Sequence, residues 1–266
     1  MALKIGKTER YIHDVLESKG AMFFMDLDPV DYKTPDEAVK VGVASAENGA
    51  DIILIGGSTG AQGDLLDYVT KNIKDKIGGS VPIVLFPGNI ATLTKHADAV
   101  YFMSLLNARN PYWLIQAHML SAGIVKGMGI EALPTGYIVV APGGTVGWVA
   151  DANLVPREKP KIAASLALAG EYLGQRLIVT DAGANPQLMG YGHVPLEMIR
   201  MVRSAISVPY VVGGGIRTEQ ELRNVISAGA DAVQIGTALE KTDGAKNLVK
   251  AFAKAVKEEG AKKLKK

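Results

Sequence analysis

Two glycine-rich segments near the carboxyl end of the chain have the residue types of phosphate-binding loops. The sequence GGGIR at 213–217 precedes TEQE at 218–221, which has the Ser/Thr-x-x-Glu form of a helix capping box. The second segment is GTA at 236–238. Glycines allow sharp turns that present backbone N–H groups, and the start of a helix adds a partial positive charge. We therefore predict that both segments bind phosphate, although the glycines could also serve only to make tight turns.

Carboxylates and a hydroxyl near the amino end could hold a metal ion. Asp26 and Asp28 lie in MDLDP at 25–29, and the alternation of side chains along a strand puts both on one face. A buried carboxylate is costly unless a cation or hydrogen bonds satisfy it. Asp28 is thus a candidate Mg²⁺ ligand, or it caps the following turn while Asp26 bonds to neighbouring strands. Ser58, within GGSTG at 56–60, could add a hydroxyl oxygen of the kind that Mg²⁺ prefers.

The elements that carry these residues form a repeating pattern. Short runs rich in β-branched and aromatic residues are each followed by Gly, Pro, Asn or Ser and then by helical apolar spacing. The expected strands are 21–28, 51–55, 82–86, 97–103, 137–140, 176–180, 209–212 and 230–235. The clearest expected helices are 36–47, 111–126, 161–173, 196–204 and 219–227, and an amphipathic segment at 8–18 precedes the first strand.

Eight such units predict a (β/α)8 TIM barrel. We expect a single domain over residues 1–266, with the extra N-terminal helix covering the amino-terminal mouth of the barrel. Because the active site of such a barrel lies at the carboxyl ends of its strands, both glycine-rich loops and the acidic segment should face one cleft. The pattern therefore predicts two anion-binding regions in that cleft, which suggests two phosphorylated substrates.

Composition limits the class of protein. Of the 266 residues, 48% are hydrophobic and 21% charged, and the net charge of +2 gives no reason to expect nucleic acid as a partner. The absence of cysteine excludes disulfide scaffolds, thiolate metal sites and a cysteine nucleophile. The first residues lack the apolar core of a signal peptide, and no apolar run is long enough to span a bilayer. We expect a cytoplasmic protein.

Four surface features suggest further contacts. The Ala/Leu-rich segment 162–170 has little polar surface, so a second subunit of a homo-oligomer or a lipid chain is expected to cover it. The basic tail at about 260–266 is expected to fray and to make at most peripheral membrane contact. Trp113 is expected to serve packing, whereas Trp148 could either pack or border a groove for an apolar ligand.

Several motifs together resemble the geranylgeranylglyceryl phosphate synthase family, the (β/α)8 prenyltransferases that include the bacterial heptaprenylglyceryl phosphate synthases. The resemblance is to the archaeal branch. The similar stretches are LDP at 27–29, GGST at 56–59, FPGNI at 86–90, HADA at 96–99, FMSLLNARNPY at 102–112, GGGIR at 213–217 and GT at 236–237. The stretch at 102–112 is specific to the family, whereas many phosphate-binding barrels share the glycine loops.

The resemblance implies Mg²⁺-dependent transfer of a geranylgeranyl group from geranylgeranyl diphosphate to the C3 hydroxyl of sn-glycerol 1-phosphate. Asp28 and Ser58 are implied to hold the metal and the donor diphosphate. The residues implied to hold the phosphate of the acceptor are Gly213, Gly214, Gly236 and Thr237. The acceptor-binding stretch after the sixth strand is implied to be Thr180, Asp181, Ala182 and Gly183, with Asp181 as the base.

This last stretch departs from the family, whose members carry Tyr-x-Glu-Ala-Gly-Ser-Gly there. Val179 replaces the Tyr, Asp181 replaces the Glu, and extra residues at about 187–192 follow. Tyr191 or His193 could supply the missing phenol or its equivalent, or the acceptor could differ from glycerol phosphate. Two rival functions stay open: an isomerase, lyase or synthase acting on one phosphorylated metabolite, and a prenyl- or phosphate-binding protein without turnover.

Overall fold

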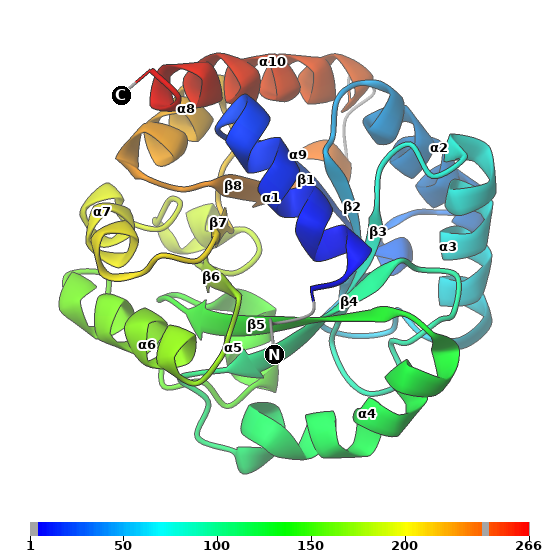
Figure 1. Ribbon diagram of the computed structural model, residues 1–266, viewed down its shortest axis with the longest axis horizontal. Coiled ribbons are helices and arrows are strands. Elements are labelled where there is room, and N and C mark those ends of the chain that lie inside the picture. Colours follow the sequence, from blue (N-terminus) through cyan, green and yellow to red (C-terminus); the bar gives the residue numbers. More distant parts are fainter. Residues whose placement is uncertain (1–4, 241–244, 266) are drawn as a thin grey trace.

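The computed structural model describes residues 5–240 and 245–265. Eight parallel strands close into a barrel in the order β1 to β8, with helices around it (Figure 1). The strands are β1 (Met22–Leu27), β2 (Ile52–Gly57), β3 (Ile83–Pro87), β4 (Ala99–Leu105), β5 (Glu131–Val139), β6 (Leu177–Asp181), β7 (Tyr210–Gly213) and β8 (Ala232–Ile235). The predicted (β/α)8 barrel is confirmed, and each expected strand overlaps an observed one.

The helices follow the expected order with some differences. They are α1 (Lys7–Lys19), α2 (Pro35–Glu47), α3 (Gly63–Ile77), α4 (Ala117–Met128), α5 (Gly144–Val149), α6 (Pro160–Tyr172), α7 (Leu196–Ala205), α8 (Glu219–Ala228), α9 (Thr237–Glu240) and α10 (Ala245–Lys263). Shorter segments are η1 (Pro29–Asp31), η2 (Tyr112–Gln116) and η3 (Pro186–Met189). The helix expected at 111–126 is divided, because the π-helical η2 precedes α4.

Alternate residues of each strand face opposite sides, which creates two apolar layers. In β1, Met22 and Phe24 belong to the cluster inside the barrel, whereas Phe23 and Met25 pack in the layer between the barrel and the helices. The same alternation puts Asp26 on the inner face, at the carboxyl end of β1. The inner face of the barrel thus changes from apolar to acidic near the mouth where the strands end.

Helix α1 covers the opposite, amino-terminal mouth, as expected for the segment at 8–18 (Figure 1). The Glu131 carboxylate accepts hydrogen bonds from the backbone N–H groups of Thr8 over 2.7 Å and of Glu9 over 3.0 Å, which satisfies donors that a helix start leaves free. The Glu9 carboxylate in turn pairs with Arg176 over 2.7 Å. These contacts close the end of the barrel away from the predicted site.

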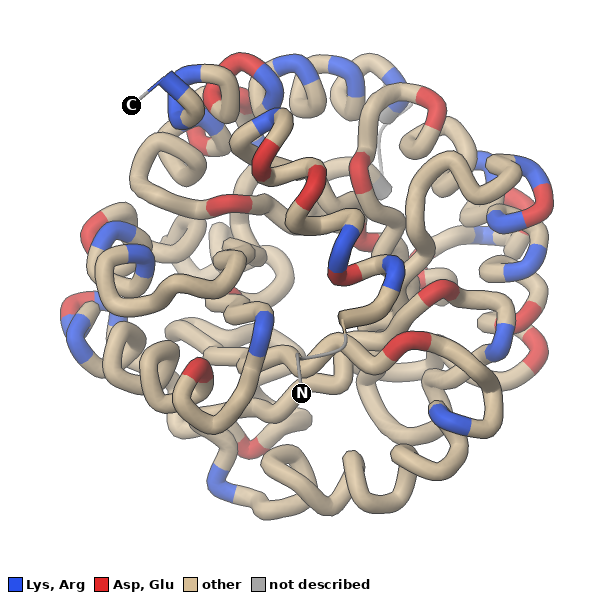
Figure 2. Tube along the Cα trace, in the orientation of Figure 1, with Lys and Arg blue, Asp and Glu red and all other residues tan. Residues whose placement is uncertain are grey.

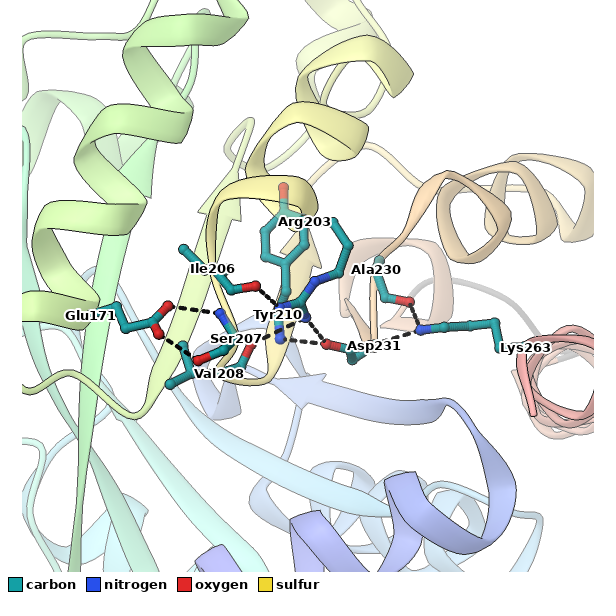
Figure 3. A network of polar contacts seen from close by, with 9 residues as sticks. All are labelled: Glu171, Arg203, Ile206, Ser207, Val208, Tyr210, Ala230, Asp231 and Lys263. Atoms are coloured by element: carbon teal, nitrogen blue, oxygen red, sulfur yellow. Dashed lines mark hydrogen bonds and ion pairs between the residues drawn. The ribbon is translucent and has the colours of Figure 1, made fainter. Parts of the chain in front are cut away.

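The carboxyl end of the chain is also held at the amino-terminal mouth. Lys263, in the last turn of α10, donates to Asp231 over 2.7 Å and to the carbonyl of Ala230 over 3.0 Å, and Arg203 of α7 meets the same carboxylate (Figure 3). The expectation of a frayed basic tail is therefore wrong for residues 260–263, which α10 includes because Asp231 anchors them. Residue 266 of that tail lies outside the described residues.

Charged residues lie mainly on the helices around the barrel (Figure 2). Within residues 5–240 and 245–265, no helix combines the length and the apolar character needed to cross a membrane.

Candidate active site

A cleft opens at the carboxyl ends of the strands and contains most of the predicted site. Of the predicted residues, those that line it are Asp28, Ser58, Asp181, Gly183, Gly214, Gly236 and Thr237. The acidic first-strand segment and the glycine-rich loops thus share one cleft, as expected. Thr180, Ala182 and Gly213 are not among its lining residues.

The glycine-rich loops present backbone donors to the cleft. Gly214 and Gly215 have φ angles of 79° and 78°, which an L-residue with a side chain rarely adopts. The N–H groups of these two residues and of Gly236 make no hydrogen bond within the described chain. Such free donors, together with the short helix α9 that begins at Thr237, have the features of the phosphate sites found at this place in barrels.

The start of α8, by contrast, is already occupied. The predicted capping box is present: Thr218 Oγ1 accepts from the Glu221 N–H, and the Glu221 carboxylate accepts from the N–H groups of Arg217 over 2.8 Å and Thr218 over 3.0 Å. These two donors are therefore unavailable to a phosphate, whereas the contribution of the partial positive charge at the start of α8 stays a prediction. Among the residues that line the cleft in the described chain, Arg217 is the one cation, and its guanidinium donates to Asn185.

Asp28 caps the turn that follows β1, which is one of its two predicted roles, and its role as a metal ligand stays a prediction. Its Oδ1 accepts from the Val30 N–H over 3.2 Å, which caps η1, while the side chain lines the cleft. The carboxylate lies against the end of β2, where a Cβ on Gly57 would be 1.9 Å from Asp28 Oδ2, next to Ser58. Burial, partly offset by the Val30 N–H, raises the pKa of Asp28 to about 7. In the described chain, no Lys or Arg side chain forms an ion pair with it.

Asp26 lies at the floor of the same cleft, inside the barrel. In the described part of the chain its carboxylate makes no hydrogen bond to a neighbouring strand, so that alternative for Asp26 is wrong. Burial raises its pKa to about 8, and the nearby Asp181 and Asp28 add to this effect. Asp26 is therefore mostly protonated near neutral pH.

Asp181 ends β6 and is 6% exposed. Its Oδ1 accepts from the Gly183 N–H over 2.5 Å, and its Oδ2 accepts from Gln234 Nε2 over 3.1 Å. The Tyr137 hydroxyl also donates to this carboxylate. Burial raises the pKa of Asp181, and these three hydrogen bonds counteract part of the rise. The group is thus held in one orientation with a pKa above the ordinary range for Asp.

Thr180 does not contact the cleft, because the strand alternation turns its side chain the other way. Its Oγ1 lies 2.7 Å from the Tyr210 hydroxyl in the layer between barrel and helices. Ala182 also packs in that layer, and its backbone bonds to Gly213 and Gly143. The side chains of Thr180 and Ala182 therefore face away from the cleft, and their part in binding the acceptor stays a prediction.

The extra residues after β6 form a loop that is fixed to its neighbours. Gln187 Nε2 donates to the carbonyl of Gly215 over 2.6 Å, and Arg157 donates to the carbonyl of His193 over 2.7 Å and lies over the ring of Tyr191. Neither Tyr191 nor His193 lines the cleft, so neither replaces the family's Tyr there. The phenol at the cleft comes from Tyr137, whose place in β5 gave no such signal.

An apolar groove continues from the cleft. Phe86 and Val146 line both, and the groove continues past Met103, Leu105 and Trp113. Trp113 packs on the inner apolar cluster, as expected, while it also borders this groove. Trp148 is 85% exposed and lines neither the cleft nor the groove. Polar anion sites and an apolar path therefore meet at one mouth of the barrel.

Comparison with known proteins gives consistent results. The PcrB family matches residues 13–256. A geranylgeranylglyceryl phosphate synthase of Thermococcus sibiricus is 50% identical over 96% of this chain and 98% of its own length, and one from Pyrococcus horikoshii is 49% identical over 90% and 91%. The crystal structure of the Thermoplasma acidophilum (S)-3-O-geranylgeranylglyceryl phosphate synthase with its substrate sn-glycerol-1-phosphate has a TM-score of 0.87 at 32% identity, over 96% of this chain and 100% of that one. The chain belongs to the PcrB family.

Proposed function

We propose that this protein transfers a geranylgeranyl group from geranylgeranyl diphosphate to the C3 hydroxyl of sn-glycerol 1-phosphate. The observation that carries the proposal is the cleft itself, which is lined by the acidic end of β1, by the loops after β7 and β8 with their free backbone donors, and by Asp181. Relatives about half identical to this chain are named for the same product. Two anionic substrates and one base fit this arrangement.

The donor diphosphate is proposed to lie with Mg²⁺ at Asp28 and Ser58. The residues fit such a metal, because Asp28 Oδ2 accepts no hydrogen bond within the described chain and Ser58 adds a hydroxyl nearby, and both are hard oxygen ligands. When bound, Mg²⁺ supplies positive charge that stabilises the leaving diphosphate. Phe86 and Trp113 border the apolar groove, which is proposed to hold the prenyl chain.

The acceptor is proposed to lie at the other end of the cleft. The backbone N–H groups of Gly214 and Gly236 and the hydroxyl of Thr237 hold its phosphate, which fixes the C3 hydroxyl near Asp181. The C3 oxygen attacks C1 of the prenyl group, the bond from C1 to the diphosphate breaks, and the hydroxyl proton passes to Asp181. A carboxylate whose pKa is raised by burial is suited to take that proton.

We also propose a homo-oligomer. Exposed apolar side chains gather on two helices: on α4 these are Met119, Leu120 and Ile124, and at the end of α6 they are Tyr172 and Leu173. Tyr172 and Leu173 are 80% and 79% exposed, and we propose that a second subunit covers them. The cytoplasmic location stays a prediction.

A direct test is to incubate the protein with Mg²⁺, geranylgeranyl diphosphate and labelled sn-glycerol 1-phosphate. The expected result is a labelled lipid and pyrophosphate in equal amounts, and their loss when EDTA removes the metal. Tight binding of the diphosphate without a lipid product would instead favour a binding protein. Turnover of glycerol phosphate in the absence of any prenyl donor would favour an enzyme that acts on one phosphorylated metabolite.

A further inference from the structure

The carboxamide of Gln234 lies inside the barrel, beside the Asp181 carboxylate. Gln234 belongs to β8, pairs in register with Phe24 of β1, lines the cleft and is only 3% exposed. Its Nε2 donates to Asp181 Oδ2 over 3.1 Å. Its Oε1 is buried and has no hydrogen-bond partner in the described chain. The amide nitrogen therefore has a hydrogen-bond partner, whereas the amide oxygen has none in the described chain.

The orientation of this amide follows from its neighbours. An ionised carboxylate only accepts hydrogen bonds, so the amide must face Asp181 through its nitrogen. β7 lies between β6 and β8, and the two side chains meet across Gly213. A Cβ on Gly213 would lie 2.5 Å from Asp181 Oδ2 and 2.8 Å from Gln234 Nε2, so only glycine leaves room for the contact. The φ of Gly213 is not positive, so its backbone alone does not require glycine.

A buried amide oxygen without a donor is unfavourable, and such an atom in a cleft indicates that a bound molecule supplies the donor. sn-Glycerol 1-phosphate carries two adjacent hydroxyls. The reacting C3 hydroxyl is assigned to Asp181, whose oxygens already accept from Gly183, Gln234 and Tyr137. The C2 hydroxyl still needs an acceptor nearby, and Gln234, which lines the same cleft, carries a neutral acceptor in its unpaired Oε1.

We propose that Gln234 is a positioning and specificity-determining residue for the acceptor. Its Nε2 orients Asp181 toward the C3 hydroxyl, and its Oε1 accepts a hydrogen bond from the C2 hydroxyl. The inference rests on the proposed function and adds to it the residue that selects acceptors with two adjacent hydroxyls. Gly213 then serves to admit this pair of side chains, whereas Gly214 and Gly236 serve the phosphate.

The test compares two acceptors that differ only at C2: sn-glycerol 1-phosphate and 3-hydroxypropyl phosphate. The wild-type enzyme is expected to prefer the first in kcat/KM by about 10-fold or more, because the second leaves the amide oxygen unpaired. In Gln234→Met, which keeps the side-chain length but has no amide, the two values should agree within about 3-fold. Gln234→Glu keeps an oxygen acceptor and should restore part of the preference.

The pH profile separates positioning from a general structural effect. The Gln234 hydrogen bond lowers the pKa of Asp181, which also faces Tyr137 and the carboxyl of Asp26. Its loss in Gln234→Met should move the acid limb of kcat/KM for the acceptor upward by about 0.5–1 pH unit. Tyr210→Phe is the matched control. It removes the buried hydrogen bond between Tyr210 of β7 and Thr180 of β6, which lies outside the barrel interior. The acid limb and the preference between the two acceptors should therefore stay unchanged.

Each outcome decides a different statement. A wild-type enzyme that makes no lipid from sn-glycerol 1-phosphate would overturn the proposed function, and this inference with it. A wild-type enzyme that uses both acceptors equally well would leave the function intact and overturn the role of Gln234. The role of Gln234 would also be overturned if Gln234→Met and Gln234→Glu kept the full preference for sn-glycerol 1-phosphate and the wild-type acid limb. This comparison requires that both variants have the melting curve and the donor KM of the wild type.

Discussion

The two ends of the cleft each place an aspartate against a glycine, yet the two aspartates have different surroundings. A Cβ on Gly57 would lie 1.9 Å from Asp28 Oδ2, and a Cβ on Gly213 would lie 2.5 Å from Asp181 Oδ2. Neither glycine has a positive φ. In both places, the missing side chain therefore makes room for a carboxylate.

The hydrogen bonds separate the two aspartates. Asp28 accepts one backbone N–H and no side-chain donor in the described chain, whereas Asp181 accepts one backbone N–H and the side chains of Tyr137 and Gln234. A carboxylate whose two oxygens both accept hydrogen bonds from neutral donors is fixed in one orientation, which suits contact with a hydroxyl. A carboxylate with one oxygen that accepts no hydrogen bond is suited to bind a cation. The same local arrangement thus holds two carboxylates in different surroundings, which matches the two different roles that we propose for them.

The largest expected effect comes from removing the proposed base. Asp181→Asn keeps the size of the side chain but cannot take the hydroxyl proton, so kcat should fall by about 10²–10⁴-fold while the KM for the donor stays near the wild-type value. Steady-state kinetics with each substrate varied in turn measures both. A loss of less than 3-fold in kcat would show that the proton goes elsewhere.

A smaller effect is expected at the other end of the cleft. Asp28→Asn removes the charge that attracts the metal, so Mg²⁺-dependent binding of the diphosphate should weaken by about 10–100-fold. Calorimetric titration with geranylgeranyl diphosphate, with and without Mg²⁺, measures this. Binding of sn-glycerol 1-phosphate should be preserved, and an unchanged donor affinity would reject the assignment of Asp28.

Gly57 and Gly213 should each affect only one end of the cleft. Gly57→Ala displaces the Asp28 carboxylate and should raise the KM for the donor by roughly 10-fold, whereas Gly213→Ala displaces Asp181 and Gln234 and should raise the KM for the acceptor by a similar factor. Kinetics of both variants with both substrates form the test. If each variant raised both KM values equally, the two ends would not be independent.

The smallest expected effect is on stability and concerns Asp26. Burial, followed by the charges of Asp181 and Asp28, raises the pKa of Asp26 to about 8. In the unfolded chain the pKa of Asp is roughly 4. Between these two pH values the folded protein therefore holds a proton that the unfolded chain has released. Stability is therefore lost as the pH rises between these two values. Asp26→Asn should be more stable than the wild type at about pH 8, by about 1 kcal/mol or more, and equal to it near pH 4. Urea denaturation at the two pH values checks this, and a difference independent of pH would contradict it.

The barrel could be predicted because each expected strand is a short run rich in β-branched and aromatic residues that is followed by Gly, Pro, Asn or Ser. β5 was expected to begin at residue 137 but begins at Glu131. Pro134 and Gly136 are typical of loops, and pairing with β4, and at Gly136 also with β6, brings them into the sheet. The residues that follow each strand at its carboxyl end could be predicted from the same pattern. Asp28, Ser58 and the glycine loops therefore appear in the cleft where expected.

The details of the acceptor end were not predictable from a contiguous motif. Alternation along β6 sends Thr180 outward and Asp181 inward, so neighbours in the sequence do not share a site. Gln234 is 53 residues from Asp181 in the sequence and reaches it only across a glycine of the strand between them. Contacts across a closed barrel depend on register and side-chain size, which no local pattern contains.

The most direct test of this account is a crystal structure with Mg²⁺, a non-hydrolysable analogue of geranylgeranyl diphosphate and sn-glycerol 1-phosphate. We expect the diphosphate at Asp28 and Ser58, the glycerol phosphate at Gly214, Gly236 and Thr237, and the C3 hydroxyl beside Asp181. Both anions at the glycine loops, or a diphosphate away from Asp28, would contradict it.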